Sequence, residues 1–193
     1  MFLDRPCSVS PHVPVVIRTL GYFDVLVDGA PLRFTGRAPR RPFDLLTAVI
    51  ASGGRAVSVV SLSDLLWPDA DGFDAYRCFT TALHRLRSLL TYPDCIRLSA
   101  GRVTLEPHRC RVDVWEFERA LRAARVADEL EAVLEQYHGP FLGDDPSPWS
   151  LAMRTRLERL VAAARASLLR KVSVSLSPAS FGREAHRDQS FRM

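Results

Sequence analysis

The stretch that decides the fold is DAYRCFTTALHRLRSLL, residues 74–90. On a helical wheel its large apolar side chains fall on one side, as expected for a helix that packs on a core. Asp74 precedes the pattern, and we expect it to cap a helix from Ala75 to Leu90. The apolar seam consists of Phe79, Leu83, Leu86 and Leu90.

The opposite face of this helix carries hydroxyls and cations. No acidic residue occurs between Asp74 and Asp94, so the exposed face is neutral or positive. Arginine forms paired hydrogen bonds with guanine O6 and N7 and also binds phosphates. A basic amphipathic helix is more often only a solvated face, so the flanking elements must decide. The expected DNA-facing residues are Arg77, Thr80, Thr81, His84, Arg85, Arg87 and Ser88.

Short strands are expected before this helix. Residues 16–20, 23–27 and 32–34 carry strand patterns, and Asp28-Gly29 is a hairpin-turn signal between the last two. These segments predict a small antiparallel sheet at the start of the fold.

Two further helices and a hairpin complete the order of elements. One helix is expected from about Phe43 to the Gly53-Gly54 pair, and a second begins at a cap, Ser58 or Ser61, and ends at Trp67-Pro68. After the long helix, residues 96–105 alternate around Ser99-Ala100-Gly101, which is typical of a hairpin. A sheet, three helices and a terminal hairpin together predict a winged helix-turn-helix.

Further positive charge lies on elements that flank the long helix in such a fold. Arg40 and Arg41 precede the first helix, and no acidic residue occurs between Asp28 and Asp44. Arg102 follows the turn of the predicted wing. These three arginines join the predicted DNA-binding surface, because positive charge around a groove-binding helix favours contact with phosphates.

Only helical periodicity appears after residue 112. Asp113 followed by Glu116 resembles a capping box, and three amphipathic helices are expected in about 60 residues, as in a helical-repeat (TPR-like) unit. The predicted fold class is therefore α+β, with a winged helix-turn-helix over 16–107 and an all-α segment over 113–172. We expect a disordered leader at 1–15 and a disordered, Ser-rich tail at 173–193.

Composition sets wider limits. The chain has 193 residues with 47% hydrophobic content and a formal charge of +4, and Lys171 is its only lysine. The small positive excess fits a polyanionic partner but is also ordinary, and the arginine bias equally fits a GC-rich genome. No signal-like segment and no run of 18 apolar residues occurs, so we expect a cytoplasmic protein without membrane contact.

Known catalytic and metal-binding patterns are missing from the sequence. It contains no GxSxG, HExxH, P-loop or CxxC motif, so we expect neither an enzyme nor a protein with a cofactor or metal. Cys95 with His108 and Cys110 lacks zinc-site spacing. Trp67, Trp115 and Trp149 lie beside apolar runs or prolines, and packing is their expected role.

Several runs of residues resemble one family. IRTLG at 17–21, the block from Gly54 to Asp69 and TALHRLRSLL at 81–90 resemble the OmpR/PhoB-type winged-helix domain of bacterial transcriptional activators. VDVWEFE at 112–118 and YHGPFL at 137–142 are similar to the bacterial transcriptional activator domain that follows it in SARP-like regulators. The resemblance implies a recognition helix that includes position 82, where Ala82 replaces a polar reader, and a helical domain that continues with further repeats.

The residues and the resemblance together predict a DNA-binding transcriptional regulator, an activator by family likeness, whose partner is double-stranded DNA. The helical segment is expected to contact RNA polymerase, another regulator or a second copy. The alternative is a protein-interaction module, or a fragment of a larger signalling regulator, with little DNA binding of its own.

Overall fold

The computed structural model describes residues 13–175, with side chains as far as Lys171. Strand β1 begins at Val15, and the last helix continues to Ser175. The expected leader therefore overlaps β1 at Val15, and the expected tail overlaps α6 at residues 173–175. Residues 1–12 and 176–193 lie outside the described part of the chain.

The N-terminal sheet has the strand order β3-β2-β1-β7 within the described residues. β1 (Val15–Arg18) pairs antiparallel with β2 (Asp24–Val27), and β2 pairs with β3 (Ala30–Pro31) across the expected Asp28-Gly29 turn. The third strand was expected at residues 32–34 but lies at Ala30–Pro31. The turn contains only Asp28 and Gly29, so Ala30 already pairs with Val27.

Strand β7 (Cys110–Val112) was not expected from the sequence. It lies parallel to β1, with Val16 opposite Arg111, and it immediately precedes the helical segment. A parallel pair joins residues far apart in the sequence, so no local turn signal announces it. The stretch between the two expected domains is thus a strand of the first sheet.

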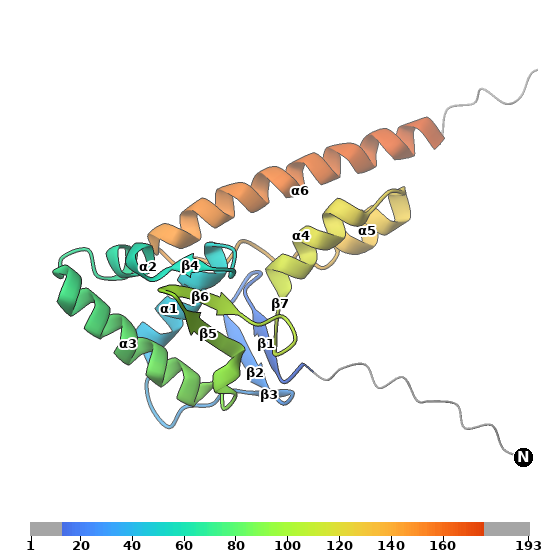
Figure 1. Ribbon diagram of the computed structural model, residues 1–193. Coiled ribbons are helices and arrows are strands. Elements are labelled where there is room, and N and C mark those ends of the chain that lie inside the picture. The colour runs from blue at the N-terminus through green and yellow to red at the C-terminus, as the bar shows by residue number, and fades with distance from the viewer. Residues whose placement is uncertain (1–12, 176–193) are drawn as a thin grey trace, which may run out of the picture.

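The middle of the chain forms a winged helix-turn-helix (Figure 1). Helices α1 (Arg40–Ala51), α2 (Val59–Leu66) and α3 (Gly72–Leu89) pack together, with α3 against both others. Strands β5 (Ile96–Ser99) and β6 (Arg102–Leu105) form the expected hairpin around Ala100-Gly101, and β4 (Val57–Ser58) pairs with β6. A short 3₁₀ turn, Pro93–Cys95, leads from α3 into β5.

The expected apolar seam of α3 is confirmed. Phe79, Leu83, Leu86 and Leu90 are at most 3% exposed. The expected cap is wrong: Asp71 caps α3, and its carboxylate accepts the Asp74 backbone N–H at 2.8 Å. The helix begins at Gly72, about one turn before the expected start. The apolar pattern did not indicate this first turn, because Ala75 is the first buried residue of α3.

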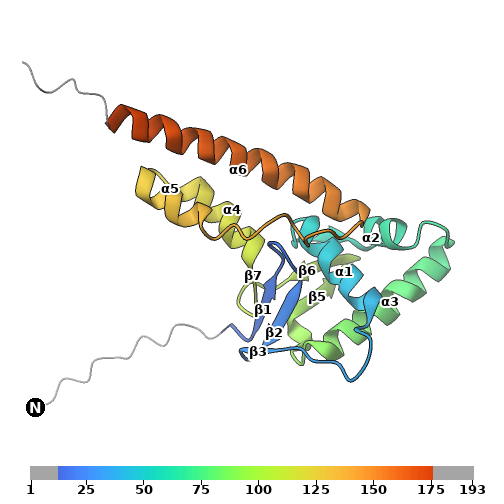
Figure 2. The ribbon, with the colours of Figure 1, turned by 180° about the vertical axis from the view of Figure 1, so that it is seen from behind.

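The helical segment contains α4 (Asp113–Ala123), α5 (Ala127–Leu134) and the long α6 (Pro148–Ser175). In both views α6 lies along α5 and reaches over to α1, so it spans the helical segment and the winged helix (Figures 1 and 2). Met153, Leu157 and Val161 on α6 are buried. The predicted α+β fold class is confirmed.

The expected capping box at the start of α4 is wrong. Val112 occupies the cap position without a side-chain hydrogen bond, and Asp113 is the first helical residue. The Asp113 carboxylate instead accepts hydrogen bonds from Thr19 and Leu20 at the end of β1, while Glu116 lies 3.6 Å from Arg111. β7 places Asp113 beside β1, where the backbone N–H groups lack a strand partner.

Candidate nucleic-acid interface

Helix α3 is the centre of the candidate interface. In Figure 1 the β5–β6 hairpin lies beside α3, and α1 packs against α3. The outer edge of α3 is solvent-exposed. In helix-turn-helix proteins an exposed recognition helix is the element that enters the major groove.

The outer edge of α3 presents cations and hydroxyls, as the wheel predicted. The Arg77 side chain is 71% exposed and lies 3.2 Å from Asp74, whereas Arg85 and His84 have no intramolecular ion pair in the described residues. The hydroxyls of Thr81 and Ser88 donate to helix carbonyls at 2.9 and 3.1 Å. Each hydroxyl oxygen still has lone pairs, and it can rotate to donate outward.

Two of the α3 positions are less exposed than expected. Thr80 is half-buried and donates its hydroxyl to the Arg77 carbonyl at 2.9 Å. Ala82 is 1% exposed and belongs to the core seam, so it cannot contact a base. The expectation for Ala82 came from the family resemblance and is corrected by its position on the inner side of α3.

Arg87 makes a structural contact that the sequence did not predict. Its Nε and Nη2 both donate to the Ile96 carbonyl of β5, at 3.1 and 2.7 Å, and the residue is half-buried. The wheel put Arg87 beside the outer face, but the hairpin lies against that side of α3. Arg87 therefore holds α3 to the wing, and its side chain is less exposed than those of Arg77 and Arg85.

Arg40 and Arg41 form the first turn of α1. Their guanidiniums lie 3.6 and 3.8 Å from the Asp44 carboxylate, and Arg41 also donates to the Leu66 carbonyl at 3.3 Å. Burial raises the pKa of Asp44, and the two arginines act against that rise. Arg40 and Arg41 keep further N–H donors for a phosphate, because each guanidinium has five.

A hollow of about 290 Å³ lies between α1 and α3. The Arg41 guanidinium lies 6.0 Å from the centre of the Trp67 ring, which also borders the hollow. Trp67 is half-buried and packs against the core, as expected from the sequence, and it also forms part of the wall of this hollow. The hollow is lined by Arg41, Pro42, Trp67, Arg77, Cys78, Thr81, Ala82 and Arg85.

Arg102 is the first residue of β6, directly after the turn of the wing. One of its nitrogens donates to the Ala56 carbonyl at 3.0 Å, and the residue is exposed. The wing tip is held against the start of α2, because Val59 donates its backbone N–H to the Gly101 carbonyl at 2.9 Å. The wing is therefore short and fixed.

Carboxylates limit the interface at one end. Asp71 and Asp74 are exposed in the first turn of α3, ahead of Arg77. Their negative charge opposes a phosphate at that end of the helix. Contact with a polyanion is thus favoured from Arg77 toward Ser88 and disfavoured before it.

The described residues contain no helix that is long and apolar enough to cross a membrane. They also contain no group of three or more His, Cys, Asp or Glu side chains arranged to hold a metal ion. Cys95 and Cys110 are buried, and burial raises the pKa of their thiols to about 11 and about 12.

One solved structure with a similar fold is described as Mycobacterium tuberculosis EmbR in complex with low affinity phosphopeptide. The TM-score is 0.65 and the sequence identity is 19%, and the match covers 84% of this chain and 46% of the EmbR chain. The present chain thus spans about half the length of EmbR. At this level of identity, the likeness shows a shared fold. No family model and no curated protein matches the chain.

Proposed function

We propose that this protein is a non-enzymatic regulator of transcription that binds double-stranded DNA with α3 in the major groove. The observation that carries the proposal is the charge around the outer edge of α3. Arg77, His84 and Arg85 lie on that edge, with Arg40 and Arg41 on the α1 side and Arg102 at the wing. Thr81 and Ser88 supply short polar groups between the cations.

The proposed contacts divide by chemistry. Arg41 and the hollow beside Trp67 suit a phosphate, because guanidinium donors there surround a space open to solvent. His84 and Arg85 lie where base edges would pass, and contacts to base edges carry sequence specificity. Thr80 and Arg87 are left with supporting roles.

The helical segment over 113–172 is assigned to protein contacts within the same proposal. The family resemblance supports RNA polymerase, another regulator or a second copy as its partner, and activation as the outcome. A protein that acts on chromosomal DNA works in the cytoplasm, and we propose that location.

DNA binding is tested by fluorescence anisotropy with labelled promoter fragments from the source genome over a salt series. The affinity is expected to fall by at least about 100-fold between about 50 and 200 mM salt, because phosphate contacts release counterions. His84→Ala with Arg85→Ala is expected to weaken binding by at least about tenfold. Arg170→Ala removes the same charge from exposed α6 and is expected to leave binding unchanged.

A flat salt response would contradict the proposal, as would equal binding by the double variant and the wild-type protein. Either result would favour a protein-interaction module. The exposed side chains of Phe73 (76%) and Tyr76 (51%) at the start of α3 would then be the first surface to test, because exposed aromatics favour protein contacts.

A further inference from the structure

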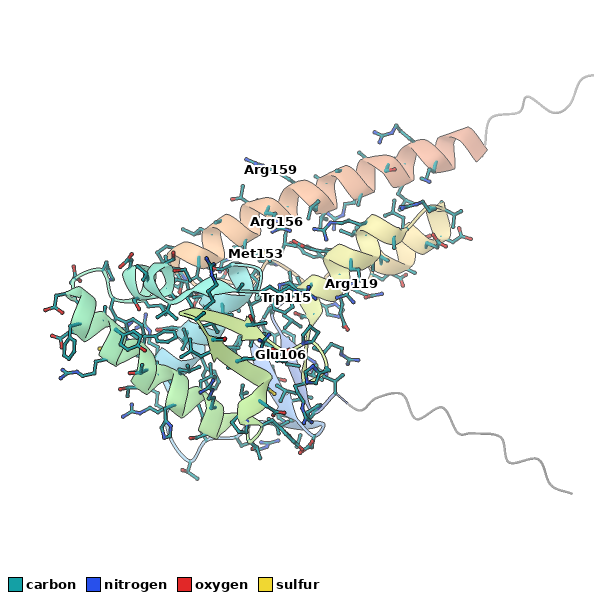
Figure 3. All side chains as sticks on the ribbon, viewed as in Figure 1. Glu106, Trp115, Arg119, Met153, Arg156 and Arg159 are labelled. Atoms are coloured by element: carbon teal, nitrogen blue, oxygen red, sulfur yellow. The ribbon has the colours of Figure 1, made fainter. Side chains whose placement is uncertain are left out.

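A second hollow, of about 420 Å³, lies where the winged helix meets the helical segment. Its walls come from the turn after α1, the end of the wing, β7, α4 and α6. Figure 3 shows Trp115 and Arg119 from α4 and Met153 and Arg156 from α6 along this junction. The volume falls within the range of pockets that hold small organic molecules.

The charge of this hollow is strongly one-sided. Its walls hold two carboxylates, those of Glu116 and Glu118, against five guanidiniums. Such an excess of cations around one space favours an anion there. The five guanidiniums belong to Arg55, Arg111, Arg119, Arg122 and Arg156.

The fold uses only part of this positive charge. Arg122 and Arg156 share one oxygen of Glu118, Oε2, at 3.0 and 2.7 Å. In the part of the chain that the structure describes, Arg55 and Arg119 make no hydrogen bond or ion pair. The guanidiniums of Arg55 and Arg119 thus border the hollow without an intramolecular partner in the described residues. Arg122 and Arg156 also have N–H donors that are not used in their bonds to Glu118.

The hollow also has an apolar wall. The Trp115 indole is held in place because its Nε1 donates to the Ile50 carbonyl at 3.3 Å. Met153 and Leu105 beside it are 4% and 1% exposed. A flat or apolar group can therefore pack on Trp115 while a charged group reaches the arginines.

We propose that this hollow binds a small organic phosphate of about mononucleotide size. A phosphate has three terminal oxygens and accepts hydrogen bonds from several guanidiniums at once, whereas one arginine fork already satisfies a carboxylate. Arg55 and Arg119 hold the phosphate, and the rest of the molecule lies against Trp115 and Met153. Because Arg55 belongs to the winged helix and Arg119 to α4, the ligand joins the two parts of the protein.

The proposal is tested by calorimetric titration of the full chain with AMP, GMP and ribose 5-phosphate, without DNA. At least one of them is expected to bind saturably at a single site. Arg55→Ala and Arg119→Ala are each expected to weaken that binding by about tenfold, because each removes a charge-assisted contact. Both residues are exposed and unpaired in the described structure, so both variants are expected to fold.

Arg159→Ala is the matched control. Arg159 is exposed on α6 and points away from the junction (Figure 3), and it does not line the hollow. Its replacement is expected to leave the affinity unchanged. Equal weakening by all three variants would show diffuse attraction by net charge, and no saturable binding of any of the three phosphates would also overturn the proposal.

A spectroscopic readout separates this site from the proposed DNA surface. In NMR spectra of labelled protein, the indole N–H signal of Trp115 is expected to shift with the bound phosphate, and that of Trp67 to stay in place. Trp67→Phe and Trp149→Phe assign the signals. A shift of Trp67 alone would place the phosphate in the hollow beside α1 and overturn this inference without affecting the proposal of DNA binding.

Discussion

The Asp113 carboxylate accepts the backbone N–H of Thr19 at 2.9 and 2.8 Å and the Thr19 hydroxyl at 2.6 Å. The same carboxylate accepts the N–H groups of Leu20 and Val114 at 3.0 and 2.7 Å. Thr19 is completely buried. One acidic side chain therefore satisfies the free donors at the end of β1 and fixes the start of α4 against the first sheet.

Replacing Asp113 with Asn is expected to lower the free energy of unfolding by about 2–3 kcal/mol, because hydrogen bonds to a charged acceptor are lost. The Asn amide also presents N–H groups to N–H donors. Urea denaturation measures the change. Asp128→Asn, in the exposed first turn of α5, is the control and is expected to cost less than about 1 kcal/mol. Equal costs would mean that Asp113 contributes only its charge near a helix end.

Gly54 and Trp115 make a second contact between the two parts of the chain. A Cβ on Gly54 would lie 2.0 Å from Cη2 of Trp115, and Gly54 has a φ of +70°. Gly53 has a φ of +92° with no atom within 4 Å of such a Cβ. Gly53→Ala is thus expected to cost about 1–2 kcal/mol from backbone strain alone.

Gly54→Ala is expected to cost about 1–3 kcal/mol more than Gly53→Ala, because the indole must move as well. Thermal unfolding of the two variants side by side gives the difference. Equal melting temperatures would indicate that Trp115 shifts without cost, and that the junction is looser than its packing implies.

Arg87 and Arg85 are expected to differ in their contribution to stability. Arg87→Ala is expected to lower the free energy of unfolding by about 1–2 kcal/mol, since it removes two hydrogen bonds to the Ile96 carbonyl. Arg85→Ala, at an exposed position, is expected to change stability by less than about 0.5 kcal/mol. The midpoints of urea denaturation measure both effects. A larger loss of stability for Arg85→Ala than for Arg87→Ala would mean that the contact between Arg87 and Ile96 does not stabilise the fold.

The buried thiols predict a loss of stability at alkaline pH. The pKa of Cys95 is raised to about 11 and that of Cys110 to about 12, chiefly by burial, from an ordinary value of 9.0. The folded protein therefore retains these protons where the unfolded chain releases them. The free energy of unfolding is expected to hold below about pH 9 and to fall as the pH rises toward about 12.

Urea denaturation at several pH values tests this expectation, with Cys110→Ala as the comparison. The variant is expected to lose less stability than the wild-type protein between about pH 8 and about pH 11, because it has one fewer thiol to ionise on unfolding. An identical loss would assign the alkaline effect to other groups, such as Tyr92, whose pKa is also raised, first by its hydrogen bond to Asp28.

Much of the winged helix could be predicted from local patterns. The Asp28-Gly29 and Ala100-Gly101 turns lie where expected, since both pairs adopt positive φ angles and connect paired strands. Ser58, one of the two expected caps of α2, accepts the Ser61 backbone N–H at 3.4 Å. Turn and cap chemistry involves only a few neighbouring residues, so a single sequence contains it.

The sequence by itself determined which side of α3 is buried, because the spacing of its large apolar residues matches the helical period. It also determined which side chains α3 carries on its other faces. Only the tertiary structure decided which of these are free: Arg85 is exposed, whereas Arg87 binds Ile96 because the hairpin packs beside it. The parallel pairing of β7 with β1, and with it the anchoring of Asp113, likewise joins residues too distant in the chain for any local pattern to specify.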